Sequence, residues 1–423
     1  MKYLNSKKVV LTTLPNEGQA IQWQTPEYFL PSTSKYVPLG LLSLATNLPE
    51  RHQVIILDPA SRGWSIDDTI ERIEAEKPDI VGISATTFKT YPLVQMLKKL
   101  NAPYKVVGGP HITHYADLVL QQGADAVFRG PLADKEFADA IDRKPVGVID
   151  CHTKINDITF PNRDNVDNEF YYATGNMFKS NKRMSMFSGV GCPNRCTFCD
   201  VQVKIPTRKR PADVVREMKY LQSIGAGEVH IYEDNFNTDR KYLEEICLEI
   251  ERQKLTMDWC GRGHAIMDLD IAKRLRQYGL KRIGVGFESL HNPTLAFYRK
   301  PQSYNTIAKF CNTMHKAGID MVGYFIVGAP TETTDYREHM GEMIWNLGIK
   351  YPLVNILQPF PNTELYTNML KDGTYKQDYW DEYIVRPTPS FKLPFPYGEK
   401  KWQEDVDLVN KLIKYFEDKR TNG

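Results

Sequence analysis

The chain has 423 residues, with 42% hydrophobic and 25% charged side chains, which is ordinary for a globular protein of two or three domains. Its formal net charge of +2 gives no general attraction to nucleic acid or to a membrane surface, so we expect neither as a partner. Residues 1–15 contain no long apolar stretch, and we therefore expect no signal peptide, no transmembrane helix and a cytoplasmic location.

The first part of the chain alternates short apolar strands with helices. The strands are expected at residues 8–14, 53–58, 79–84, 105–107 and 126–128, and the helices at 39–47, 65–77, 93–100 and 116–122. This alternation predicts an α/β domain with a doubly wound, Rossmann-like parallel sheet. Ligands of such sheets bind at the carboxyl ends of the strands. Small and polar residues follow three of these ends, at 84–87, 108–111 and 129–130.

A second series of strands and helices begins at residue 184. The strands are expected at residues 185–189, 228–232, 257–260, 282–287, 320–327 and 353–358, and the helices at 212–224, 240–253, 271–278, 306–317 and 335–347. Six strands with intervening helices predict a partial (β/α)6 barrel with an active site at the carboxyl ends of its strands. We therefore divide the chain into a first domain (1–140), a linker (141–183), a barrel (184–365) and a C-terminal extension (366–423).

The C-terminal extension is rich in proline and aromatic residues, and a closing helix is expected at 402–418. We expect its aromatic side chains to form a packed plug at the bottom of the barrel, and a lid over the barrel mouth is the alternative. These side chains belong to Tyr375, Tyr379, Trp380, Tyr383 and Phe391.

Three cysteines stand close together in the run Gly-Val-Gly-Cys-Pro-Asn-Arg-Cys-Thr-Phe-Cys-Asp. Cys192, Cys196 and Cys199 have the spacing CxxxCxxC, and three thiolates so placed can hold three corners of a 4Fe–4S cluster. The fourth iron then has no protein ligand, as in open catalytic metal sites. A structural zinc site or a chance group of thiols is the alternative. A disulfide framework is not expected in a chain of this size and location.

The triplet, with the aromatic Phe198 before its third cysteine, resembles the signature of the radical SAM superfamily. The resemblance implies that the open iron binds the amino and carboxylate groups of S-adenosylmethionine. One electron, from a donor such as ferredoxin or flavodoxin, then cleaves the sulfonium to methionine and a 5′-deoxyadenosyl radical. That radical abstracts a hydrogen atom from the substrate.

Four later segments resemble the parts of this superfamily that bind S-adenosylmethionine. Helix capping is the alternative for Glu288, and a surface location is the alternative for Arg262. The implied contacts are Glu233 and Asp234 with the methionine part, Arg262 with the carboxylate, Glu288 and Ser289 with the ribose, and Gly328 and Pro330 with the adenine. Residues 359–364 resemble the Pro-x-Pro-Gly-Thr turn that closes the core, with Asn362 replacing glycine because Asn also tolerates a positive φ.

The first domain resembles the cobalamin-binding domain of the cobalamin-dependent radical SAM family. Three runs carry the resemblance, at residues 38–45, 78–84 and 106–111. The cobalamin contacts that it implies are Leu39, Gly40, Ser84, Thr86, Gly108, Gly109, Pro110 and Gly130.

The first domain departs from that family in two places. No Asp-x-His-x-x-Gly run is present, so no histidine is placed to bind cobalt from below, and we expect His111 and His114 to meet the nucleotide tail or solvent. The run Arg-Gly-Pro-Leu at residues 129–132 stands where Gly-Glu-Gly-Glu is usual. A relic domain that no longer binds cobalamin is therefore the alternative.

Together the resemblances imply a cobalamin-dependent radical SAM C-methyltransferase that uses two molecules of S-adenosylmethionine. One would remethylate cob(I)alamin, and the other would make the radical, so that the substrate radical takes its methyl group from methylcobalamin. The alternatives are cyclisation or rearrangement of a small metabolite and a non-catalytic iron–sulfur sensor. A peptide or protein side chain is favoured slightly over a small molecule as substrate, because the Pro-rich extension could hold an extended chain.

Overall fold

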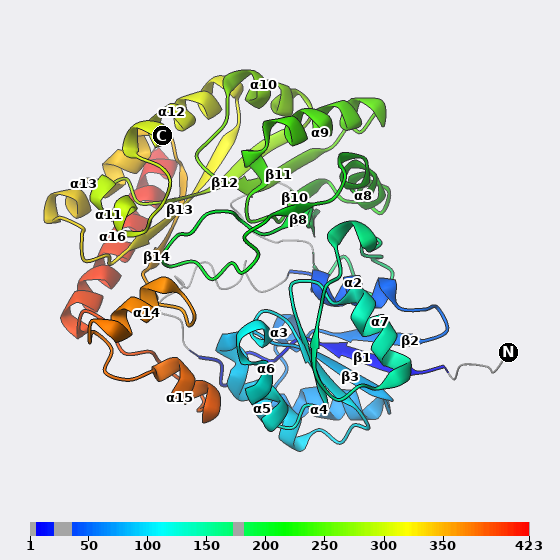
Figure 1. Ribbon diagram of the computed structural model, residues 1–423. Coiled ribbons are helices and arrows are strands. Elements are labelled where there is room, and N and C mark those ends of the chain that lie inside the picture. The colour runs from blue at the N-terminus through cyan, green and yellow to red at the C-terminus, as the bar shows by residue number, and fades with distance from the viewer. Residues whose placement is uncertain (1–5, 21–35, 172–181, 423) are drawn as a thin grey trace. The chain divides into compact units, whose positions relative to one another are not determined.

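The computed structural model describes residues 6–20, 36–171 and 182–422. Among these residues, the contacts divide the chain into two compact units (Figure 1). The first unit contains the described residues up to Tyr171 together with Gln377–Leu393, and the second contains those from Lys182 to Lys376 and from Pro394 onward. No helix among the described residues is long and apolar enough to cross a membrane.

The first unit is built on a six-stranded parallel sheet with the order β2-β1-β3-β4-β5-β6. Its strands are β1 (Lys8–Thr12), β2 (Gln53–Leu57), β3 (Ile80–Ser84), β4 (Lys105–Gly108), β5 (Ala126–Arg129) and β6 (Gly147–Asp150). The doubly wound sheet expected from the sequence is confirmed. The sixth strand, β6, was missed because it lies in the segment expected to be a linker.

Helices cover both faces of this sheet (Figure 1). They are α2 (Leu39–Asn47), α3 (Pro59–Arg62), α4 (Ile66–Ala75), α5 (Thr90–Lys99), α6 (Ile112–Gln121) and α7 (Asp134–Arg143), with a 3-10 turn, η2, at Thr87–Lys89. Val9 and Val10 are neighbours in β1 but belong to separate buried clusters, because successive strand residues point to opposite faces. Both faces are therefore core.

The second unit contains another six-stranded parallel sheet, in the order β14-β13-β12-β11-β10-β7. Its strands are β7 (Arg183–Met186), β10 (Glu228–Ile231), β11 (Asp258–Gly263), β12 (Leu280–Glu288), β13 (Asp320–Val327) and β14 (Tyr351–Ile356). The helices between them are α8 (Pro211–Ser223), α9 (Arg240–Arg252), α10 (Leu269–Gln277), α11 (Asn292–Phe297), α12 (Tyr304–Ala317) and α13 (Thr334–Asn346). Because the strands follow chain order and all run parallel, the expected six-membered β/α series is confirmed. A short antiparallel hairpin of β8 (Gly189–Val190) and β9 (Thr207–Arg208) flanks the cysteine loop.

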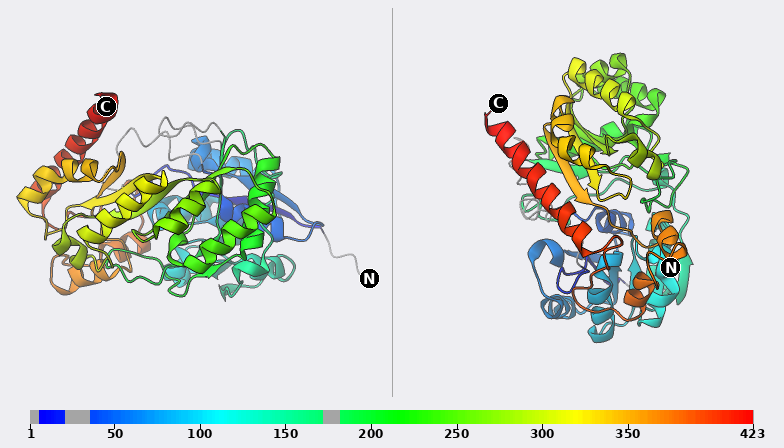
Figure 2. Two further views of the ribbon diagram at one scale, coloured as in Figure 1. Left: turned by 90° about the horizontal axis from the view of Figure 1, so that it is seen from above. Right: turned by 90° about the vertical axis from the view of Figure 1, so that its left-hand side faces the viewer.

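The C-terminal extension is shared between the units. After α14 (Glu364–Lys371), the segment with α15 (Tyr379–Val385) belongs to the first unit. There the Trp380 ring meets Phe88 edge-on with centroids 5.6 Å apart, and the Phe391 ring stacks on Tyr383 at 4.4 Å. Trp380, Tyr383 and Phe391 are therefore packed within the first unit, and the expectation that they plug the barrel is wrong for these three side chains. Tyr375 lies in the second unit and packs against Tyr366, with ring centroids 5.4 Å apart. Helix α16 (Glu399–Asn422) returns to the second unit and runs beside β14 and α13 (Figure 2).

Candidate active site

The three cysteines of the triplet lie on one loop between β8 and β9. The backbone fixes this loop at its start: Gly191 N–H donates to Asp234 Oδ2 at 3.1 Å, and Cys192 N–H donates to the Val203 carbonyl at 2.9 Å. Gly191 has φ +99°, and a Cβ at this position would lie 2.7 Å from the Val203 carbonyl oxygen. Only glycine fits this entry to the loop.

Thr197 fastens the middle of the cysteine loop to two distant segments. Its N–H donates to the Tyr298 carbonyl at 3.0 Å, and its hydroxyl donates to the Phe297 carbonyl at 3.2 Å. The Leu365 N–H donates to the Thr197 carbonyl at 2.8 Å. The loop is therefore held by contacts with two other segments of the second unit.

The three thiols are free and form no disulfide. Burial raises the pKa of Cys196 to about 11, and burial also raises the pKa of Cys199. Among the described residues, no group of three or more Cys, His, Asp and Glu side chains converges on one metal ion. A 4Fe–4S cluster binds each cysteine through a different iron, so its ligands need not converge on a point. Free thiols on a fixed loop fit such a cluster, because iron displaces their protons when it binds.

Both acidic residues after β10 are engaged by the chain itself. Glu233 is buried and accepts from the Ser188 hydroxyl at 2.5 Å and from Arg208 Nε at 2.7 Å. Asp234 accepts from the N–H just before Cys192, as described above. The structure thus shows these carboxylates holding the cysteine loop and its hairpin, and their role toward the methionine part stays a prediction.

Arg262 projects from β11 over aromatic rings. Its guanidinium lies 4.1 Å from the centre of the Tyr232 ring and 5.9 Å from that of Tyr324. Its buried Nε has no hydrogen-bond partner among the described residues. A surface location is therefore excluded, and a half-buried guanidinium with an unused donor fits an anionic ligand group such as a carboxylate.

Glu288 at the end of β12 forms a buried ion pair that the sequence did not predict. Lys300 Nζ donates to Glu288 Oε1 at 2.8 Å, and both residues are only 8% exposed. Glu288 has φ +63°, uncommon for a non-glycine residue, and the strand register shifts between Gly286 and Glu288. A Cβ at Gly286 would lie 2.3 Å from Glu288 Oε1. The capping alternative for Glu288 receives no support from these contacts.

Ser289 is fully buried, and its hydroxyl donates to the Tyr336 hydroxyl at 3.0 Å while accepting from the His291 N–H at 3.1 Å. Its hydroxyl is thus occupied within the protein, and its predicted contact with ribose stays a prediction. Asn362 has φ +62°, which confirms the expected positive φ in that turn.

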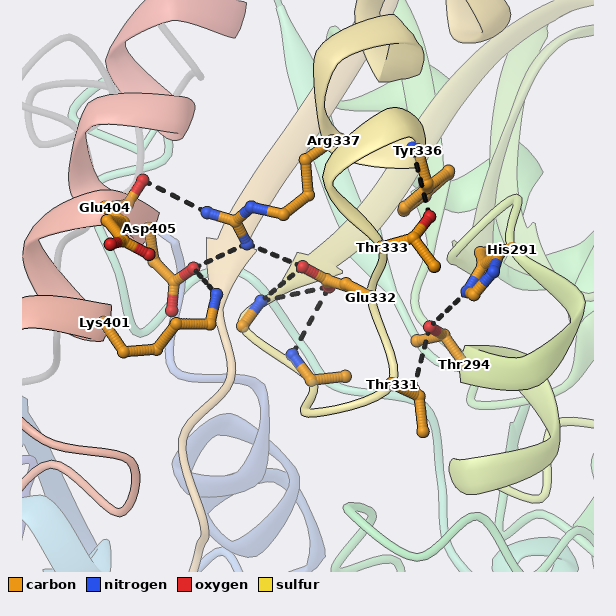
Figure 3. A network of polar contacts seen from close by, with 12 residues as sticks. His291, Thr294, Thr331, Glu332, Thr333, Tyr336, Arg337, Lys401, Glu404 and Asp405 are labelled. Carbon is orange, nitrogen blue, oxygen red and sulfur yellow. Dashed lines mark hydrogen bonds and ion pairs between the residues drawn. The ribbon is translucent and has the colours of Figure 1, made fainter.

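A polar network fixes the turn after β13, the predicted adenine-side turn (Figure 3). Glu332 accepts from the N–H groups of Gly328 and Ala329 at 3.0 and 3.3 Å. Arg337 then joins Glu332 to Asp405 on α16, with both contacts at 2.7 Å. The C-terminal helix therefore helps to shape this turn, whereas Pro330 at its tip is exposed.

The predicted cobalamin residues gather at the carboxyl edge of the first sheet. The loops after β3 and β4 are tied together, because Ala85 N–H donates to the Gly108 carbonyl at 2.8 Å and His111 N–H donates to the Ala85 carbonyl at 3.2 Å. Gly109 has φ +104°, and its Cβ would lie 2.7 Å from the Ala85 carbonyl. The close packing of the loops after β3 and β4 therefore requires glycine at position 109, independently of any contact with cobalamin. The other predicted contacts follow the same edge: Leu39 and Gly40 begin α2, Ser84 ends β3, Thr86 precedes η2, and Pro110 and Gly130 follow β4 and β5.

His111 is fully buried, which excludes solvent as its partner, and its contact with the nucleotide tail stays a prediction. Its ring is tilted against the Tyr115 ring with centroids 5.0 Å apart, and its Nδ1 lies 3.3 Å from the Thr87 hydroxyl. Burial lowers the pKa of His111 to about 3, which keeps the imidazole neutral.

Sequence reasoning missed a polar cluster beside β1, at the point where the strand order reverses. Asp58 accepts from the Thr13 hydroxyl at 2.6 Å and from the Tyr171 hydroxyl at 3.0 Å. Lys89 Nζ donates to the Leu14 carbonyl at 2.7 Å, and burial lowers the pKa of Lys89 to about 8. Crevices at such reversal points are where doubly wound sheets bind ligands.

Comparison with known proteins agrees with both halves of this description. The radical SAM superfamily model matches residues 186–344, and the B12 binding domain model matches residues 29–136. The chain is 27% identical to an uncharacterised methyltransferase of Pyrococcus horikoshii over 379 residues, or 82% of each protein. It is 24% identical to the hopanoid C-2 methylase of Rhodopseudomonas palustris, over 87% of this chain and 70% of the methylase.

Among solved structures, the radical S-adenosylmethionine methyltransferase TsrM from Kitasatospora setae, with tryptophan and an S-adenosylmethionine analogue bound, has a TM-score of 0.70. It is 17% identical and covers 87% of this chain and 76% of its own. The alternatives of a relic first domain and of a non-catalytic sensor find no support in these comparisons. The chain belongs to the cobalamin-dependent radical SAM family, methyltransferase type, and is an enzyme that uses a 4Fe–4S cluster, S-adenosylmethionine and cobalamin.

Proposed function

We propose that the enzyme methylates an unactivated carbon of its substrate. When bound, the cluster and S-adenosylmethionine supply the radical that removes a hydrogen atom, and cobalamin supplies the methyl group that replaces it. The observation that carries the proposal is a loop that hydrogen bonds hold in place and that presents three free cysteines, in the same unit as Arg262. The guanidinium of Arg262 is half-buried and has an unused donor, Nε. That unit thus offers ligands for a cluster and a partner for the carboxylate of S-adenosylmethionine.

Each group of this chain then has a defined task. Cys192, Cys196 and Cys199 bind three irons, and Arg262 receives a carboxylate through its guanidinium. Glu288, oriented by Lys300, accepts hydrogen bonds from hydroxyl groups. In the first unit, the loops at the carboxyl edge of the sheet hold cobalamin, and the buried Asp58 and the half-buried Lys89 lie at its reversal point.

The proposed reaction consumes two molecules of S-adenosylmethionine and two electrons for each methyl group transferred. The methyl donor leaves as S-adenosylhomocysteine, and the second molecule leaves as methionine and 5′-deoxyadenosine, which carries the hydrogen atom of the substrate. The electrons come from a low-potential one-electron donor of the ferredoxin or flavodoxin class. Seven free cysteines and this demand for reductant support a reducing, cytoplasmic location.

For the substrate, we propose a small organic molecule instead of a peptide. The Pro-rich extension was the reason to favour a peptide, but its aromatic side chains Trp380, Tyr383 and Phe391 are used in packing. The related hopanoid methylase is named for a small molecule, and TsrM holds tryptophan. These relatives support a compact substrate and leave its identity open.

The test is anaerobic reconstitution with iron, sulfide and hydroxocobalamin, followed by desalting. We expect retained cobalamin and, after reduction with S-adenosylmethionine labelled in its methyl group, 5′-deoxyadenosine and labelled product from a small-molecule extract. Cys196→Ala should abolish the cluster and 5′-deoxyadenosine while cobalamin is retained, and Cys247→Ala, a buried cysteine on α9, is the matched control. Loss of cobalamin on desalting would refute methyl transfer, and 5′-deoxyadenosine without labelled product would indicate cyclisation or rearrangement.

A further inference from the structure

The buried Lys300–Glu288 pair lies beside the cysteine loop, and no predicted function uses the lysine. We propose that Lys300 is a positioning residue of the cluster site, whose fixed positive charge orients Glu288 and favours reduction of the cluster. The inference rests on the proposed binding of the cluster by Cys192, Cys196 and Cys199. It adds a role for a residue that the sequence motifs do not include.

The backbone locks Lys300 in place relative to the cysteines. Its N–H donates to the Leu295 carbonyl at 2.9 Å, and its carbonyl accepts from the Gln302 N–H at 2.8 Å. Only two residues earlier, the Tyr298 carbonyl receives the Thr197 N–H of the cysteine loop. The Phe198 and Tyr298 rings meet edge-on at 5.1 Å and reinforce this junction. Lys300 is therefore part of the wall that holds the loop, unlike a mobile surface lysine.

A third segment closes the junction. Arg299, next to Lys300, forms an ion pair with Glu364, and the following Leu365 N–H donates to the Thr197 carbonyl. The cysteine loop, the segment after α11 and the start of α14 are thus joined pairwise. These contacts hold the backbone at Lys300 close to the cysteine loop.

The ammonium and the carboxylate are buried together next to the segment that holds the cysteine loop. Lys300 Nζ donates to Glu288 Oε1 at 2.8 Å, and each residue is only 8% exposed. Because a carboxylate at hydrogen-bond distance favours the charged form of a buried ammonium, Lys300 keeps its positive charge.

Three local features of the backbone place the Glu288 carboxylate next to the Lys300 ammonium. Glu288 adopts φ +63°, the strand carries an irregularity before it, and Gly286 leaves room for both charged ends. A buried ion pair is weak evidence for stability, because an apolar pair of similar volume often serves equally well. An arrangement that also demands an uncommon backbone conformation points to a role for the charges themselves.

The physical effect follows from charge. One electron from the donor adds one negative charge to a cluster that is already anionic with three thiolates, and no bond changes at this step. A cation fixed in a poorly solvated site stabilises the reduced cluster more than the oxidised one, which raises the reduction potential. The nearby carboxylate of Glu288 acts in the opposite sense.

The experiment measures the reduction potential of the reconstituted full-length enzyme by redox titration followed by electron paramagnetic resonance, without S-adenosylmethionine. We expect Lys300→Met to lower the potential, with about a tenfold fall in the ratio of reduced to oxidised cluster at a fixed solution potential, the effect of one charge in a partly buried site. Glu288→Gln is expected to raise the potential. Lys300→Arg should restore most of the wild-type value, and Lys273→Met on the exposed side of α10 should leave it unchanged.

The outcomes separate this inference from the proposed function. An unchanged potential in Lys300→Met, or shifts of the same sign in Lys300→Met and Glu288→Gln, would overturn it. If Lys300→Met does not fold, the double variant Lys300→Met/Glu288→Gln removes both charges, and its potential should lie below that of Glu288→Gln. Failure of the wild-type enzyme to take up iron and sulfide would instead overturn the assignment of the three cysteines.

Discussion

Arg337 is expected to be among the most sensitive positions of the second unit, and Arg337→Met tests the network in Figure 3. The guanidinium is 15% exposed and contacts two buried carboxylates, Glu332 and Asp405, at 2.7 Å each. Removing one partner of a buried ion pair typically costs about 3–5 kcal/mol, because the remaining charge stays buried. Two backbone N–H groups still serve Glu332 and Lys401 still serves Asp405, so we expect the lower end, about 3 kcal/mol.

The assay is thermal unfolding of the full chain, with Arg252→Met as the matched control. Arg252 also pairs with a carboxylate, Glu249, but it is 65% exposed, and such pairs contribute about 0–1 kcal/mol. Arg337→Met should therefore lower the midpoint by several degrees, and Arg252→Met by little. Binding of S-adenosylmethionine should weaken as well, because the turn at Gly328 loses its support. Equal midpoints for the two variants would refute the view that α16 stabilises this turn.

Three further predictions concern single contacts. Burial lowers the pKa of Lys89 from 10.5 to about 8, so between these two pH values the folded state binds fewer protons than the unfolded state. The free energy of unfolding of the wild type, measured by denaturant titration relative to Lys89→Met, should therefore rise by about 3 kcal/mol from pH 8 to pH 10.5. Gly286→Ala should cost about 1–3 kcal/mol in denaturant unfolding because its Cβ would displace the Glu288 carboxylate, whereas Gly40→Ala, with open space around its Cβ, should be neutral or stabilising. Thr197→Val should lose about 1 kcal/mol and release iron to a chelator faster than the wild type; an unchanged release rate would show that the hydroxyl does not fasten the loop.

The two sheets could be predicted because each strand is a short apolar run bounded by polar residues, and parallel order follows from the helices between them. The cysteine triplet could be predicted because its three members are local in sequence. Lys300 could not, since it lies about a hundred residues from Cys196, and only tertiary packing of the segment at Tyr298 brings them together. No residue pattern near Lys300 signals that contact.

The carboxylates after β10 show a second limit of sequence reasoning. Spacing places Glu233 at a strand end, but it does not say whether the side chain turns to a ligand or to a neighbouring loop. In the structure, Ser188 and Arg208 both donate to Glu233.

The segment at α15 is a third case. Its aromatic pattern predicts packing, but the unit against which it packs depends on Phe88, which lies far away in the sequence, in the predicted first domain.

Two cationic side chains of the second unit correspond to negative charges that its cofactors bring. Arg262 keeps an unused donor beside aromatic rings, and S-adenosylmethionine carries a carboxylate. Lys300 is paired with Glu288 and lies two residues after the Tyr298 carbonyl that binds the cysteine loop, and a cluster with three thiolates is anionic. Glu332 and Arg337, in contrast, are satisfied within the chain and serve only to shape a turn. Because burying an unpaired donor of a cation is costly, Arg262 is explained best by an anionic partner that arrives with the cofactors.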